Sequence, residues 1–138
     1  MKKYILVFIL IIWCTKLFAQ DKPLTIENYY KLTWGHATEF IDLWKKNHYP
    51  LLKKLLEKGD LLSIKAETPI LHSGEDTRWD FKVTLTFKTE HLAMDYSIVD
   101  NFKKQLFPDQ EAYAKAEKQR FELVLAHWDG PVETLPLN

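Results

Sequence analysis

This chain contains little cysteine and little glycine, and it has no net charge. Its 138 residues include one cysteine, Cys14, and four glycines, and its 19 basic side chains balance 19 acidic ones. A single cysteine excludes an intramolecular disulfide and a zinc site built from several thiolates. The five histidines show no HxxxH, HxH or HExxH spacing, and there is no GxSxG nucleophile motif. We therefore predict no metal site, and expect stability to come from core burial, alone or with a partner subunit.

The first twenty residues have the pattern of an export signal. Lys2 and Lys3 precede an apolar run over residues 4–13, and Ala19 is a small residue at a suitable cleavage point. The run is short for a membrane span, which needs about 20 apolar residues. We predict a signal peptide over 1–19, with export to a periplasm or to the medium. A retained single-helix anchor is the alternative.

Cleavage would change the charge and the thiol content of the protein. Removing Lys2, Lys3 and Lys16 leaves 16 of the 19 basic side chains against 19 acidic ones, a net charge of −3. Cys14 would leave with the leader. A weakly acidic protein has no electrostatic reason to bind nucleic acid or, once cleaved, an anionic membrane, so we predict neither partner.

The remainder of the chain reads as a polar arm over 20–27 followed by one domain over 28–138. Residues 28–34 alternate in polarity, which predicts a half-buried strand. Residues 37–58 then carry apolar side chains at helical spacing, and Gly59 is placed to end that helix. Pro50 interrupts the pattern, so we expect a kink near residues 48–49.

Further elements follow with clear boundaries. Residues 60–71 predict a strand at a sheet edge, because Pro69 cannot donate to a ladder. Residues 78–88 alternate strictly and predict the clearest strand. A helix is expected from 89 onward, broken near Pro108 and continued to about 123, and a last strand is expected within 124–135.

This order of elements predicts a ferredoxin-like α+β fold, βαββαβ, with helices on one face of a four-stranded antiparallel sheet and the second helix split near Pro108. The chain, over residues 28–132, resembles the dimeric α/β-barrel superfamily, in an exported branch related to antibiotic-biosynthesis-type monooxygenases and stress-responsive barrel proteins. The resemblance implies a homodimer whose sheets pack face to face, and a small-molecule ligand held between sheet and helices.

An aromatic-rich cluster is the predicted pocket between sheet and helices. Apolar walls with a few polar groups are typical of small-molecule sites, but they are equally typical of a filled core. Both readings stay open. The residues expected to line the pocket are Tyr30, Trp34, Trp44, His48, Trp79 and Trp128.

His48 and Tyr30 are the candidate catalytic residues, although no motif assigns a reaction. Trp44 and His48 are i,i+4 neighbours, and a kink at Pro50 would free polar backbone for a ligand. The alternative is that His48 satisfies the unpaired carbonyl and binds nothing else. His127 and Asp129 would share one face of a strand, as a carboxylate-oriented imidazole does.

The polar side of the sheet is the predicted dimer interface. We expect Lys31, Arg78, Asp80 and Lys82 to lie there, with Asp80 pairing between Arg78 and Lys82. Charges buried in a face-to-face dimer must pair. We expect no stacking aromatics on this side, which argues against an RNA-binding sheet.

Three functions remain open on the sequence. We favour an exported dimer that binds a small apolar or aromatic ligand, and the alternatives are an oxygenase-like enzyme and a non-catalytic assembly module. The haem-degrading members of the superfamily offer one comparison, in which only Asn28 matches and Phe87 stands where a tryptophan is expected. We predict no cofactor, with haem kept as the alternative for an oxygenase.

Overall fold

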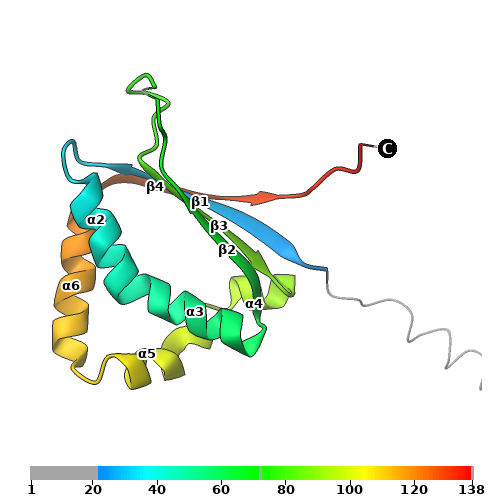
Figure 1. The fold of residues 1–138 in the computed structure, drawn as a ribbon. Coiled ribbons are helices and arrows are strands. Elements are labelled where there is room, and N and C mark those ends of the chain that lie inside the picture. The colour runs from blue at the N-terminus through cyan, green and yellow to red at the C-terminus, as the bar shows by residue number, and fades with distance from the viewer. Residues whose placement is uncertain (1–21, 72, 138) are drawn as a thin grey trace, which may run out of the picture.

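A four-stranded antiparallel sheet carries the helices of the described residues on one face (Figure 1). The computed structural model describes residues 22–71 and 73–137, so the predicted signal peptide lies outside the described residues. The strand order is β2-β3-β1-β4, which places β2 and β4 at the edges. The predicted ferredoxin-like α+β fold, with its edge strand before Pro69, is confirmed.

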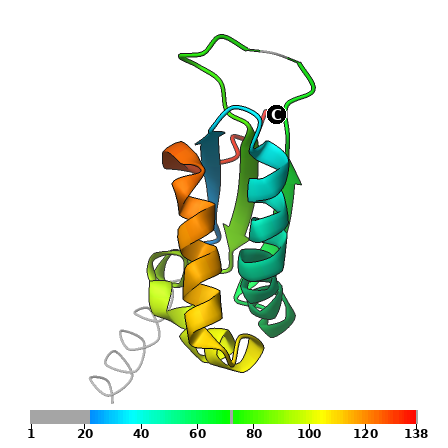
Figure 2. The same cartoon turned by 90° about the vertical axis from the view of Figure 1, so that its left-hand side faces the viewer.

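The elements follow the predicted order, with the helical segments more finely divided. They are β1 (Leu24–Leu32), α2 (Ala37–Leu43), the π-helix η2 (Trp44–His48), α3 (Tyr49–Lys58), β2 (Leu61–Glu67), β3 (Phe81–Phe87), α4 (Glu90–Met94), the 3₁₀-helix η3 (Tyr96–Val99), α5 (Asp100–Leu106), α6 (Gln110–Glu122) and β4 (Val124–Val132). Figure 2 shows α6 beside α2 and α3 in front of the sheet.

The central strand β1 begins earlier than its polarity pattern suggests. Leu24 pairs with Phe87 of β3, so residues 24–27 are part of the strand and not of a polar arm over 20–27. Leu24 and Ile26 pack against the core, which continues the alternation of Tyr30 and Leu32 towards the N-terminus. The strand also ends before Trp34, which the alternation had included.

The irregularity expected at Pro50 takes the form of a π-helical turn just before the proline. The Tyr49 amide donates to the carbonyl of Trp44, a bond to the fifth preceding residue. Pro50 has no amide hydrogen to continue an α-helical ladder, so the turn before it can widen at little cost. Trp44 and His48, the ends of this turn, both come to lie on the inner side of the helical layer.

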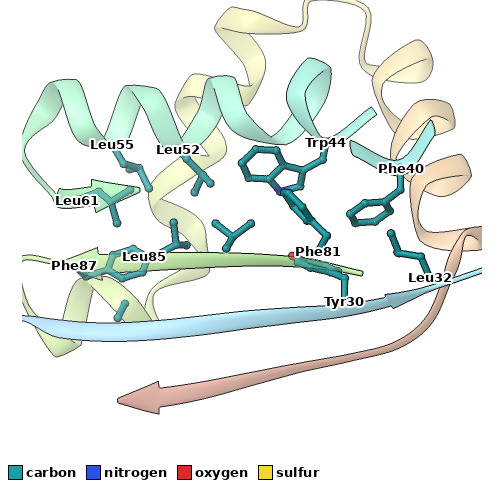
Figure 3. Close-up of a cluster of buried hydrophobic side chains, with 12 residues drawn as sticks. Tyr30, Leu32, Phe40, Trp44, Leu52, Leu55, Leu61, Phe81, Leu85 and Phe87 are labelled. Atoms are coloured by element: carbon teal, nitrogen blue, oxygen red, sulfur yellow. The ribbon is translucent and has the colours of Figure 1, made fainter. Parts of the chain in front are cut away.

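The core fills the space between the sheet and the first helical segment (Figure 3). Every second residue of β3 is buried, and α3 buries Leu52 and Leu55 against them. Burying one such side chain contributes about 1.5–3 kcal/mol. α3 ends where Gly59 adopts a left-handed conformation, with φ of 84°, and donates its amide back to the last turn.

The second helical segment has two breaks. The Thr89 hydroxyl accepts the Leu92 amide at the start of α4, and the Asp109 carboxylate accepts the Ala112 amide at the start of α6. The break between α5 and α6 surrounds Pro108, as predicted. A further break at Asp95 separates α4 from η3.

Candidate functional site

A cavity of about 380 Å³ lies between the sheet and the helices. Most of its wall is aliphatic or aromatic, and the polar side chains are few, which is the composition of a small-molecule site. β1, β3 and β4 form one wall and the helical elements form the other. The lining residues are Ile26, Asn28, Tyr30, His48, Leu52, Leu55, Leu85, Phe87, Leu92, Ala93, Met94, Asp95, Tyr96, Ile98, Val99, Arg120, Phe121, His127, Asp129 and Pro131.

Tyr30 is the aromatic centre of the site. It is buried at 6% exposure on β1, and its ring stacks on His127 of β4 with centroids 4.2 Å apart and planes 8° from parallel. Burial raises the pKa of its phenol to about 12, and the nearby Arg120 only partly opposes this. Tyr30 is therefore protonated at every physiological pH.

His48 reaches the cavity from the end of the π-helical turn. Its pKa is lowered to about 4, chiefly because burial disfavours the charged ring and secondly because the Arg120 charge is near. The ring is thus neutral at pH 7. It makes no hydrogen bond to another residue of the described chain, so the alternative in which His48 satisfies a free carbonyl has no support in the geometry.

Arg120 is a cavity residue that the sequence did not reveal. It is 2% exposed, and its Nε and Nη2 donate to the two carboxylate oxygens of Glu117 at 3.1 and 2.7 Å. Its guanidinium also lies 4.4 Å from the ring centroid of Phe121. The Glu117–Arg120 spacing of three on a helix signals an ion pair, but nothing in the sequence indicates that α6 turns this pair inward.

His127 and Asp129 form the β4 side of the site. The His127 Nδ1–H donates to the Tyr29 carbonyl at 2.9 Å, since a carbonyl can only accept. The Nε2 atom lies 3.4 Å from Asp129 Oδ1. The predicted shared face is correct, and the Nε2–Asp129 contact becomes an ion pair only when the ring is protonated.

Of the six residues predicted to line the pocket, the structure brings only Tyr30 and His48 to the cavity. Trp44 is buried in the core beside His48, with ring centroids 6.0 Å apart, but it does not line the cavity. Trp34 is 66% exposed after the end of β1, where Arg78 lies over its ring at 4.1 Å.

Trp79 and Trp128 lie on the opposite face of the sheet, which corrects their predicted place. Trp128 pairs with Tyr29 in the β1–β4 register and stacks on it at 5.3 Å, while Trp79 meets Tyr29 edge-on at 6.0 Å. Trp79 precedes β3, so the alternation of that strand does not set its direction. The expectation that this open face lacks stacking aromatics is therefore wrong.

The predicted interface residues form two separate networks. The Arg78 guanidinium contacts Asp80, donates to the Leu32 carbonyl and is 4% exposed. Asp80 also accepts the Leu32 amide at 2.7 Å, so this pair ties β1 to the chain before β3.

Lys82 belongs to the second network. Its ammonium lies 3.3 Å from Glu27 and 3.1 Å from Glu67, not beside Asp80 as predicted. Lys31 pairs with Glu75 at 2.8 Å, and Glu75 also accepts from Arg78, so Lys31 belongs to the Arg78 network. The single network with Asp80 at its centre is therefore not formed, because Asp80 is turned towards Arg78 and the β1 backbone.

Two classes of feature are absent from the described residues. Within 22–71 and 73–137, no three side chains of His, Cys, Asp or Glu are grouped closely enough to hold a metal ion. Over the same ranges, no helix has the length and apolar character needed to cross a bilayer.

Comparison with known proteins identifies the fold. No protein-family model matches the sequence, and no curated protein matches it. A NIPSNAP family protein from Agrobacterium tumefaciens aligns with a TM-score of 0.53 and 10% identity, over 87% of this chain and 92% of its own. A dimeric ferredoxin-like protein from an uncultured marine organism aligns with a TM-score of 0.51 and 7% identity, over 86% and 94%.

A Pseudomonas aeruginosa protein gives a similar result. Its TM-score is 0.52 at 11% identity, over 86% of this chain and 99% of its own. At such identities the likeness concerns the fold alone. The predicted resemblance to ferredoxin-like barrel proteins is confirmed at that level.

Proposed function

We propose that this protein is an exported, homodimeric ferredoxin-like domain that binds one small, mainly apolar molecule between its sheet and its helices. The observation that carries the proposal is the cavity of about 380 Å³, whose wall is largely apolar. The pocket is partly open to solvent, since Met94 and Tyr96 of its lining are exposed, so an apolar ligand that binds there removes apolar surface of the wall from water.

The pKa values of Tyr30 and His48, two polar residues of the lining, favour binding over catalysis. Tyr30, with a pKa of about 12, is a poor acid at neutral pH, and His48, with a pKa of about 4, is a weak base. A general acid or base works best with a pKa near the working pH. The residues expected to be catalytic are thus better suited to donate and accept hydrogen bonds.

A homodimer is supported by the open face of the sheet. Tyr29, Trp79 and Trp128 form an aromatic cluster there, beside the ion pairs of Lys82 with Glu27 and Glu67. Aromatic residues flanked by matched charges are typical of protein interfaces. The marine ferredoxin-like protein of the same fold is described as dimeric.

Native mass spectrometry of the protein recovered from exporting cells tests this proposal. We expect the mass of a dimer whose subunits begin at Gln20, with an additional small mass on each subunit. A Val99→Trp variant, which fills the cavity from η3, should lose the additional mass. A Val132→Trp variant, outside the cavity, should keep it. An empty wild-type protein that also takes up no apolar probe would refute the proposal.

A further inference from the structure

The polar side chains around the cavity differ in whether they already form hydrogen bonds within the protein. Asn28 donates its amide to the Val83 carbonyl at 3.0 Å, and Arg120 is held by both oxygens of Glu117. Asp95 accepts the amide and the hydroxyl of Ser97. These bonds commit the Asn28 amide nitrogen, two of the three Arg120 nitrogens and one Asp95 oxygen to the fold.

The β4 wall is committed in the same way. The His127 Nδ1–H donates to the Tyr29 carbonyl, and Nε2 lies 3.4 Å from Asp129, with which it pairs only when the ring is protonated. The remaining aromatic alcohol of the lining, Tyr96, is 85% exposed and is hydrated without a ligand. The β4 wall therefore supplies apolar contact and a partly exposed carboxylate acceptor.

Two uncharged lining groups that are less exposed than Tyr96 donate no hydrogen bond within the described chain. The Tyr30 hydroxyl donates to no acceptor among these residues, and Arg120, its charged neighbour, can only donate. The His48 ring makes no hydrogen bond to any of them. A ligand that pairs with these groups uses hydrogen-bonding capacity that the described residues leave unused.

The charges of the lining residues narrow the class of ligand further. The charge of Arg120 is paired with Glu117, and the Asp129 carboxylate repels an anion. A charged group moved into a largely apolar cavity loses its hydration without compensation. Both free groups are themselves uncharged at pH 7, which agrees with an uncharged ligand.

We infer that the cavity selects an uncharged, mainly apolar molecule with one hydroxyl or carbonyl group, which hydrogen-bonds to the Tyr30 hydroxyl and the His48 imidazole. The inference rests on the proposed function, because it assigns the ligand class of the same cavity. Apolar area supplies the affinity, and the two hydrogen bonds supply the selectivity.

Three probes of equal shape and different polarity test it: naphthalene, 2-naphthol and 2-naphthoate, titrated at pH 7 by calorimetry. We expect 2-naphthol to bind about two- to tenfold more tightly than naphthalene, as one or two net hydrogen bonds allow, and 2-naphthoate to bind least. Tyr30→Phe and His48→Leu should each reduce the preference for 2-naphthol. His36→Leu, a change at an exposed histidine, should leave it intact.

The outcomes separate this inference from the proposed function. Equal binding of naphthalene and 2-naphthol, or tightest binding of 2-naphthoate, would overturn the ligand class while leaving the cavity as a binding site. Binding of none of the three would overturn both. Because the probe series is decisive on the wild-type protein, a variant that fails to fold does not leave the inference unresolved.

Discussion

His48 should make the protein less stable in mild acid, and His48→Leu should remove that effect. The pKa of His48 is lowered from 6.5 to about 4 by burial and by the charge of Arg120. Between these values the unfolded state binds a proton that the folded state does not, so stability falls as the pH falls through this window. The loss from pH 7 to pH 4.5 is about 2 kcal/mol.

The window is separate from that of the carboxylates. Glu75, whose pKa is lowered to about 2 by hydrogen bonds from Arg78 and Lys31, loses its stabilising pairs only as the pH falls below 4.5. Between pH 7 and 4.5 a buried histidine should therefore dominate the slope. This makes the range suitable for isolating His48.

Urea unfolding at pH 7, 5.5 and 4.5 measures the effect, at one fixed protein concentration because a dimer's stability depends on it. The wild-type protein should lose about 2 kcal/mol more than His48→Leu over this range. His36→Leu should keep the wild-type slope, since His36 is exposed. Equal slopes for the wild type and His48→Leu would refute the assignment of His48 as a neutral buried ring.

Three further predictions concern other parts of the fold. Gly59→Ala should destabilise the protein by about 1–2 kcal/mol in urea unfolding, because φ is 84° there and open space around the site leaves only the backbone cost. Arg78→Met should cost about 3 kcal/mol, since it leaves the Asp80 carboxylate without its cationic partner, and an unchanged melting temperature would contradict this. Lys82→Glu should weaken self-association in sedimentation experiments, whereas Lys118→Glu on α6 should not, and equal effects would count against the open face as the interface.

The fold was predictable because its strongest patterns are local. The alternation of 81–87 and the helical spacing of 37–58 each bury one side of an element, and these two surfaces meet in the core. Pro50 and Pro108 mark real interruptions because a missing amide hydrogen acts wherever the proline stands. The widening into a π-helical turn was not predictable, since a kink or a break satisfies the same sequence.

The site was less predictable because it depends on which face of the sheet each side chain points to and on how the strands pair. The alternation of β3 was extended to Trp79, which lies outside the strand and faces the other way. Trp128 points away from the cavity because it pairs with Tyr29, and register between strands distant in sequence cannot be read from either alone. Arg120 was missed because a charged residue on a polar helix is ordinarily solvated.

Methyl NMR of the protein titrated with 2-naphthol tests the central claim, that the space between sheet and helices is a ligand site. Lining methyl groups from both walls, those of Ile26, Leu52 and Ile98, should shift together and saturate at one probe per subunit. The methyl groups of Leu62 and Val132, which lie outside the cavity, should stay in place. Shifts confined to the outer methyl groups, or none at all, would contradict the account.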